Sequence, residues 1–187
     1  MTLSHALFPS MSRLTQVLMV LGGSLFIAIA AQIAVPMVPV PMTLQTLAIL
    51  IVGLTYGARL GAATLVVYLA EGAMGLPVFA NGAGTLAYMM GPTGGFLLGF
   101  VMMAFLAGLA VDRGIARGVV STGLVTLAVS ALLYVPGLVW PAAIMGKTFD
   151  VLWLHWMSPF LAGDVLKAVL AALIVTGGWA LMKARKG

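Results

Sequence analysis

The sequence predicts an all-α, polytopic membrane protein: a single membrane-embedded domain over residues 1–187, folded as a compact bundle of six transmembrane helices. Its 187 residues are 63% hydrophobic and only 7% charged, whereas soluble domains are about 45–50% apolar and about 25% charged. So few charges do not cover a water-exposed surface. Since a transmembrane helix needs roughly 20 mostly apolar residues, the chain has room for about six spans with short connections.

Glycine and proline divide the chain into the expected helices. These cover residues 14–35, 44–56, 60–73, 94–111, 119–135 and 159–182. The first helix stops at residues 36–41, where three prolines remove N–H donors and forbid a regular helix. The second helix is about 20 Å long at 1.5 Å per residue, which is too short to cross a hydrocarbon core of about 30 Å. Either the proline segment dips into the membrane or this helix ends below the surface.

Residues 75–85 interrupt the helical pattern. They read Gly-Leu-Pro-Val-Phe-Ala-Asn-Gly-Ala-Gly-Thr, which is too rich in Gly and Pro for a helix and too apolar for a solvated loop. Irregular backbone at membrane depth is tolerated only where protein buries it or where it lines a cavity. This segment is therefore predicted to form part of a cavity wall.

Basic residues orient the bundle, because Lys and Arg accumulate near the cytoplasmic ends of membrane helices. With both termini in the cytoplasm, seven basic residues fall on that side: Arg13, Arg59, Arg113, Arg117, Lys183, Arg185 and Lys186. Only Lys147 then lies in an outer loop, and Lys167 lies inside the membrane. The proline segment, the Gly/Asn loop and residues 140–156 face outward. Trp140, Trp153 and Trp156 fit an aromatic belt at the outer interface.

Two charged residues lie within the last predicted helix. Asp164 and Lys167 are spaced i and i+3, so they share one face. A charge at mid-membrane costs about 2.5–3.5 kcal/mol on insertion scales, and such residues usually face the interior of the bundle. The pair is interpreted either as a salt bridge that locks two helices or as part of a binding site. Its position beneath the outward loops favours a site that a small molecule reaches from outside.

A few other polar residues are candidates for the same site. Asn81, the only Asn in the chain, precedes a glycine and suits a tight turn, but its amide also offers donors and an acceptor. Thr43 and Gln45 follow the proline segment, where Thr43 either caps a helix or lines a pocket with Gln45. Glu71 is interpreted as a boundary charge of the third helix.

Other functional classes lack the residues they need. There is no cysteine, and His5 and His155 stand alone, so no metal site is predicted. No nucleophile motif is present, and no catalytic residue is assigned. The net charge of +5 comes from scattered basic residues, which do not suit nucleic acid. Because the chain has no nucleotide-binding motif, concentrative transport would need another protein or an ion gradient.

Three segments carry a family resemblance. They are residues 39–46 (Pro-Val-Pro-Met-Thr-Leu-Gln-Thr), residues 75–79 (Gly-Leu-Pro-Val-Phe) with 91–96 (Gly-Pro-Thr-Gly-Gly-Phe), and residues 162–168 (Ala-Gly-Asp-Val-Leu-Lys-Ala). Together they resemble the biotin transporter BioY family, the substrate-binding S components of energy-coupling factor transporters. The resemblance covers nearly the whole chain.

The resemblance implies a six-helix, multi-pass protein of the bacterial cell (inner) membrane that binds biotin from outside as a ligand, with no cofactor. In the family a transmembrane coupling protein and two ATPase subunits power uptake, although some members are thought to act without them. The family's polar contacts with biotin match Asn81, Asp164 and Lys167. Asp164 suits the two N–H donors of the ureido ring. Lys167 suits either the ureido carbonyl or the valerate carboxylate.

The resemblance also has a departure and a docking prediction. Many members carry a Gly-Gly pair, often with a nearby Arg, where residues 82–85 here read Gly-Ala-Gly-Thr. The carboxylate of biotin is thus left without an obvious cationic partner in this loop. The family docks on its coupling protein through small residues of the first helix. Ala30 and Ala34 have the matching spacing, which generic tight helix packing explains equally well.

Other functions stay open at this point. An S component for another vitamin would share the fold and differ in its pocket, and a solo biotin transporter would share the pocket and lack the partner. A membrane enzyme using Asp164 as a base lacks a second acidic or nucleophilic group. A structural subunit would not need a buried Asp–Lys pair beneath polar loops.

Overall fold

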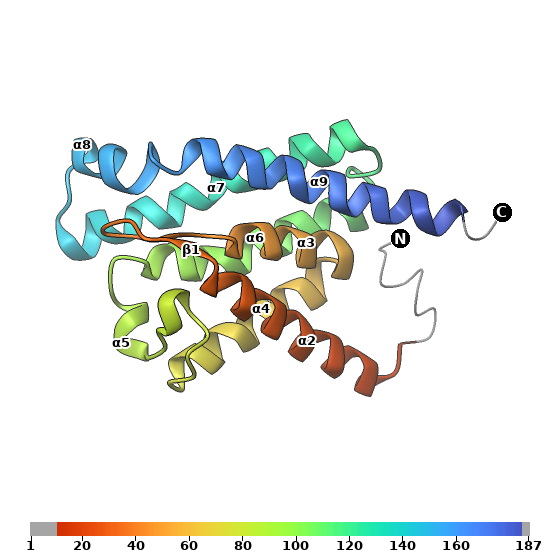
Figure 1. The fold of residues 1–187 in the computed structure, drawn as a ribbon, viewed down its shortest axis with the longest axis horizontal. Helices are drawn as coiled ribbons and strands as arrows, with labels where there is room; N and C mark the ends of the chain where they lie inside the picture. The colour runs from red at the N-terminus through yellow and green to blue at the C-terminus, as the bar shows by residue number, and fades with distance from the viewer. Residues whose placement is uncertain (1–10, 185–187) are drawn as a thin grey trace.

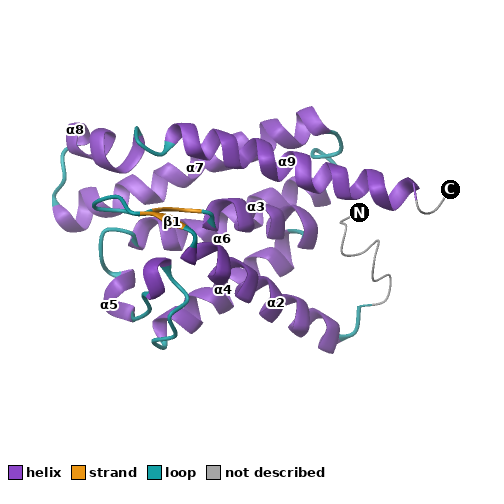
Figure 2. Ribbon diagram, viewed as in Figure 1, coloured by secondary structure: helices purple, strands orange, loops and turns teal. Residues whose placement is uncertain are grey.

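The computed structural model describes residues 11–184 and consists almost entirely of helices (Figure 1). The long helices are α2 (Arg13–Gln32), α3 (Gln45–Tyr56), α4 (Ala58–Ala73), α6 (Gly94–Asp112), α7 (Val119–Met145) and α9 (Leu161–Ala184). Shorter elements are α5 (Leu86–Met89), α8 (Phe149–Leu152), the 3₁₀ turn η1 (Ala80–Gly82) and the π turn η2 (Trp153–Met157). The strands β1 (Ala34–Val35) and β2 (Met42–Thr43) form a small ribbon (Figure 2). Arg185, Lys186 and both chain termini, on which part of the predicted orientation rests, lie outside the described residues.

The helices pack in layers around α6. Helices α7 and α9 lie side by side along one edge of the molecule, α2 and α4 lie along the opposite edge, and α3 and α6 lie between them (Figure 1). Helix α6 contacts α3, α4 and α7. The β ribbon, α5 and α8 gather at one end of the bundle (Figure 1). The irregular segments therefore share one end, as the charge pattern predicted, whereas the side of the membrane they face stays a prediction.

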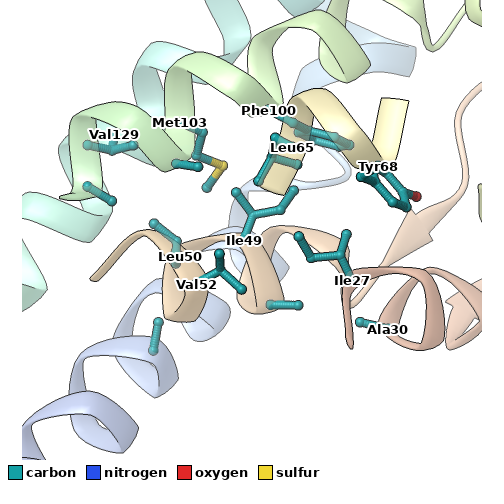
Figure 3. Packing of buried hydrophobic residues seen from close by; sticks show 14 of the residues in the cluster. Ile27, Ala30, Ile49, Leu50, Val52, Leu65, Tyr68, Phe100, Met103 and Val129 are labelled. Atoms are coloured by element: carbon teal, nitrogen blue, oxygen red, sulfur yellow. The ribbon is translucent and has the colours of Figure 1, made fainter. Parts of the chain in front are cut away.

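Both the interior and the outer surface of the bundle are apolar. Fully buried side chains from α2, α3, α4 and α6 interlock in the core, among them Ile27, Ile49, Leu65 and Met103 (Figure 3). In the described part of the chain, four segments are long and apolar enough to cross a membrane: Arg13–Gln32, Gly94–Asp112, Val119–Met145 and Leu161–Met182. Helix α3 is apolar but has only 12 residues. The predicted all-α fold with several possible membrane spans is confirmed. The predicted number of six spans is not confirmed.

The first helix is shorter than predicted. It ends at Gln32 rather than at residue 35, because the chain turns into β1. Strand β1 pairs antiparallel with β2, with Ala34 opposite Thr43 and Val35 opposite Met42. The carbonyl of Ile33 also accepts a hydrogen bond from Leu44 N–H at 3.1 Å. The backbone groups of residues 33–35 therefore form hydrogen bonds with residues 42–44, on the other side of the proline segment, instead of within a helix.

The prediction that Ala30 and Ala34 are spaced along one helix is wrong. Ala34 lies in β1, so the two residues do not form an i, i+4 pair on one helix face. Ala30 is 7% exposed and packs in the protein's own core (Figure 3). One member of the pair is covered and the other is not helical, so we do not place a docking surface on them.

The fifth predicted helix is longer than expected. Helix α7 continues past residue 135 and contains both Pro136 and Pro141. Although proline removes a helical hydrogen bond, neighbouring helices allow it in membrane helices. Here α7 packs very closely on α6: a Cβ added to Gly95 would lie 2.1 Å from the carbonyl oxygen of Pro136. This packing keeps the helix continuous, and residues 140–145 are helix rather than outer loop.

Two of the three tryptophans of the predicted belt bond to the protein's own backbone. The indole N–H of Trp140 donates to the carbonyl of Gly91 at 3.0 Å, and that of Trp156 donates to the carbonyl of Pro92 at 3.3 Å. Trp156 is also buried, whereas Trp153 is 41% exposed. Two of the three indoles thus fix the segment before α6. Trp140 is half-buried and Trp153 is exposed, and the position of these two residues at the outer interface stays a prediction.

Glu71 is more than a boundary charge. Its carboxylate accepts a hydrogen bond from the hydroxyl of Ser24, which is fully buried in α2. A second carboxylate, that of Asp112 at the end of α6, accepts the N–H of Ala58 at 2.9 Å. Each of these acidic residues therefore joins α4 to a neighbouring helix.

Candidate functional site

A cavity of about 580 Å³, including its open mouth, lies at the end of the bundle where the irregular segments gather. Its wall comes from the β ribbon, the segment around η1, and helices α3, α6, α7 and α9. Four of the predicted site residues line it: Thr43, Gln45, Asp164 and Lys167. Asn81 does not, although its neighbour Ala80 does.

The charged pair forms one polar centre of the cavity. Lys167 Nζ lies 2.7 Å from Asp164 Oδ1 and donates a second hydrogen bond, of 3.3 Å, to the carbonyl of Thr43. Asp164 Oδ2 accepts from the hydroxyl of Tyr134 at 2.5 Å. The pair therefore joins α9, β2 and α7. An ammonium group has three N–H donors, so Lys167 keeps one for a ligand, and the carboxylate keeps lone pairs.

Both interpretations of the Asp164–Lys167 pair have support in this geometry. The two residues do form a salt bridge within α9, and the contacts of Lys167 and Asp164 with Thr43 and Tyr134 tie other elements to that helix. The same two residues line the cavity, and Lys167 is only 6% exposed. A buried ion pair is costly unless its remaining donors and acceptors are satisfied. A polar ligand would satisfy those that face the cavity.

Thr43 and Gln45 begin a chain of hydrogen bonds. The Thr43 hydroxyl accepts from Gln45 N–H at 3.1 Å and donates to Gln45 Oε1 at 2.9 Å. Gln45 Nε2 donates to the Tyr68 hydroxyl at 2.7 Å, which in turn donates to the carbonyl of Val78 at 2.8 Å. Thr43 thus serves the start of α3 and lines the cavity as well. The chain fixes the β ribbon, α3, α4 and the loop after α4 relative to one another.

Aromatic rings supply much of the apolar wall. Phe79 is fully buried, stacks on Tyr88 with ring centres 5.6 Å apart, and meets the edge of Tyr68 at 5.5 Å. Phe96 meets Tyr134 edge to face at 6.0 Å. Phe79, Tyr88, Phe96 and Tyr134 all line the cavity. These residues were not predicted from the sequence, because scattered aromatics in a membrane chain usually face lipid or fill the core. The hydroxyl of Tyr134 inside an apolar helix was the one available signal.

Asn81 occupies a turn. Its backbone is left-handed, with φ 58° and ψ 32°, and its side chain is exposed. Asn tolerates this conformation better than most residues. The loop is held from α2 by Gln32, whose Nε2 donates to the carbonyl of Phe79 at 3.0 Å and whose Oε1 accepts from Gly82 N–H at 2.9 Å. The turn interpretation accounts for Asn81 in this structure, and its contact with a ligand stays a prediction.

The chemistry of the cavity suits non-covalent binding. The carboxylate of Asp164 is engaged by Lys167 and Tyr134, and no second acidic residue lines the cavity. Within residues 11–184, no group of three or more His, Asp and Glu residues is placed to hold a metal ion. The site combines one charged centre with an apolar, aromatic wall.

Comparison with known proteins agrees with this description. The family model of the BioY family matches residues 4–184. The chain belongs to the BioY family. The probable biotin transporter BioY of Pyrococcus horikoshii is 38% identical over 154 residues, which cover 81% of this chain and 90% of that protein. The biotin transporter BioY of Rhizobium etli is 37% identical over 163 residues, covering 82% and 87%.

A solved structure shares the fold. The S-component for biotin from an ECF-type ABC transporter superposes with a TM-score of 0.76, covering 95% of this chain and 96% of that one at 24% identity. The family match and the sequence relatives confirm the resemblance to the BioY family seen in the sequence. With several apolar helices long enough to span a membrane, this BioY family member is a multi-pass membrane transport protein rather than an enzyme.

Proposed function

We propose that this chain is the biotin-binding S component of an energy-coupling factor transporter. The observation that carries the proposal is the buried Asp164–Lys167 pair in the wall of an otherwise largely apolar cavity of about 580 Å³. The carboxylate accepts from the N–H groups of the ureido ring, and the free N–H of Lys167 donates to its carbonyl. The aromatic wall suits the sulfur-containing ring and the methylene chain. The named activity of the relatives and the shared fold support the same ligand.

The proposed topology has six spans, formed by α2, α3, α4, α6, α7 and α9, in the cytoplasmic membrane. Both termini and Arg13, Arg59, Arg113 and Arg117 then lie on the cytoplasmic side, following the positive-inside rule. These four arginines lie at the start of α2, at the start of α4 and between α6 and α7. The β ribbon, α5 and α8 lie at the outer side, which opens the cavity outward. Short α3 and α4 reach the surface through the segments that follow or precede them.

The proposed partners are a transmembrane coupling protein and two ATPase subunits. The sequence has no nucleotide-binding motif, so this chain does not hydrolyse ATP. Uptake against a gradient therefore draws its energy from another protein. A solo biotin transporter, which would use a gradient, is the alternative, and uptake in cells lacking the coupling protein distinguishes the two.

Biotin titration of the purified full-length chain tests the proposed ligand. We expect saturable binding of one biotin per chain, followed by heat or by the fluorescence of Trp140 and Trp156, which hold the segment before α6. Thiamine and riboflavin serve as control ligands and should not compete. Folded protein that binds another vitamin and ignores biotin would contradict the assignment and indicate an S component for that vitamin.

The role of Asn81 is tested by two substitutions. Asn81→Gly keeps the left-handed turn and removes the amide, whereas Asn81→Ala removes the amide and strains the turn. We propose that the amide turns toward bound biotin, so Gly should weaken binding by about three- to tenfold, the value of one neutral hydrogen bond. Binding and thermal unfolding are measured for both. If Asn81→Gly binds biotin with wild-type affinity and only Asn81→Ala loses stability, the amide does not contact the ligand and Asn81 serves only to form the turn.

A further inference from the structure

Two threonine hydroxyls in the cavity wall have no hydrogen-bond partner. Thr46 Oγ1 and Thr93 Oγ1 are shielded from solvent, and they are the two buried side-chain polar atoms left unpaired among residues 11–184. Both residues line the cavity. A buried polar group without a partner costs about 1–3 kcal/mol. Among the protein's own groups, these two hydroxyls therefore have an unmet hydrogen-bonding requirement beside the binding site.

Two buried threonines away from the cavity, Thr64 and Thr126, are paired. Thr64 donates to the carbonyl of Leu60 at 2.8 Å. Thr126 donates to the carbonyl of Ala168 at 3.0 Å and to that of Gly123 at 2.9 Å. Threonine in a membrane helix usually satisfies its hydroxyl through such carbonyls. The unpaired hydroxyls are thus specific to the cavity and not a general feature of the fold.

Their positions are fixed by the surrounding structure. Thr46 lies in the first turn of α3, directly after Gln45, whose side chain is held by Thr43 and Tyr68. Thr93 directly precedes α6, where a threonine would ordinarily cap the helix, yet its hydroxyl makes no capping bond. The segment before Thr93 is held by the indole groups of Trp140 and Trp156. Both hydroxyls therefore belong to well-held parts of the wall.

We propose that Thr46 and Thr93 are ligand contacts, which hydrogen-bond the polar atoms of the ligand that Asp164 and Lys167 leave unpaired. The identity of the ligand as biotin rests on the proposed function. Biotin has polar atoms at both ends, the ureido ring and the carboxylate, and the charged pair serves one end. A hydroxyl donates to an oxygen or accepts from an N–H, so it suits either end. A ligand of the same shape without polar atoms at these points would leave the hydroxyls unpaired and be rejected.

Valine substitutions separate a ligand contact from a structural role, because valine keeps the shape of threonine and removes the hydroxyl. In Thr46→Val and Thr93→Val the ligand-free protein should unfold at the same temperature as the wild type or higher, since an unpaired group has been removed. Biotin affinity should fall by about three- to thirtyfold in each variant. Thr126→Val is the matched control, because it loses paired hydrogen bonds away from the cavity. It should unfold at a lower temperature and bind biotin as the wild type does.

The outcomes distinguish this inference from the proposed function. If the wild type binds biotin and both valine variants bind equally well, only the inference is overturned. If the valine variants unfold at lower temperatures, the hydroxyls have a structural partner and the inference is also overturned. If the wild type binds a different vitamin, the proposed ligand is wrong, and weaker binding of that vitamin by the valine variants would still support the two contacts.

Discussion

Lys167→Met is expected to lower biotin affinity by at least about a hundredfold and to destabilise the ligand-free protein. Methionine matches the length of lysine but removes the ion pair with Asp164 and the hydrogen bond to the Thr43 carbonyl. The Asp164 charge would keep only the Tyr134 hydroxyl as a partner in a largely buried position. Removing one member of a buried ion pair costs about 3–5 kcal/mol. Biotin titration and thermal unfolding in the same detergent measure the two effects.

A double substitution distinguishes a binding role from a structural one. Asp164→Asn with Lys167→Met removes both charges, and the asparagine oxygen still accepts from Tyr134. Replacing a buried pair by neutral groups is often tolerated, so stability should recover while biotin binding should not. Lys147→Met is the matched control, since Lys147 lies outside the cavity, and it should change neither quantity. Recovery of binding together with stability would show that the pair only locks the helices.

The parts of the fold that were predictable are set by local residue types. Helix α6 begins at Gly94 as expected, because the Gly-Pro-Thr segment before it interrupts the helical pattern. Helix α3 starts one residue from its predicted position, after the proline segment. Asp164 and Lys167 were found because a charge inside an apolar helix is costly and needs a reason. In each case the deciding information lies within a few residues of the feature.

The features that were missed depend on contacts between distant segments. The β ribbon pairs residues 34–35 with 42–43 across a proline-rich turn, and α7 continues through Pro136 because α6 packs against it. Nothing in the type or spacing of Phe79 and Phe96 separates a cavity wall from a lipid-facing surface. The unpaired hydroxyls of Thr46 and Thr93 are visible only when every possible partner has been placed.

Hydrogen bonds connect the site to two irregular segments, the β ribbon and the loop after α4. Lys167 holds the β ribbon through the Thr43 carbonyl, and Gln45 reaches the loop after α4 through Tyr68 and Val78. The shape of the cavity wall therefore depends on the position of the loop after α4. The ring of Phe79 is the part of this loop that is buried in the wall. A substitution that moves this ring without touching any polar group tests how much the apolar wall contributes.

Gly72→Ala is expected to weaken biotin binding by about tenfold or more and to destabilise the protein by about 1–3 kcal/mol, the usual cost of overpacking. A Cβ at residue 72 would lie 2.0 Å from Cζ of Phe79. The ring is fully buried between Tyr68 and Tyr88 and lines the cavity. It therefore yields either by turning into the cavity or by moving with its loop, and both changes alter the binding site. Titration with biotin and thermal unfolding of the ligand-free protein measure the result.

Gly177→Ala provides the control, because a Cβ at this α9 position meets no atom within 4 Å. It should leave binding unchanged and stabilise the helix slightly, by up to about 1 kcal/mol. Adding Phe79→Leu to Gly72→Ala removes the clash and should restore part of the stability. Binding should stay weak in this double variant, because the stacking surface of the ring has been lost. Wild-type affinity in Gly72→Ala itself would mean that the position of Phe79 does not shape the site.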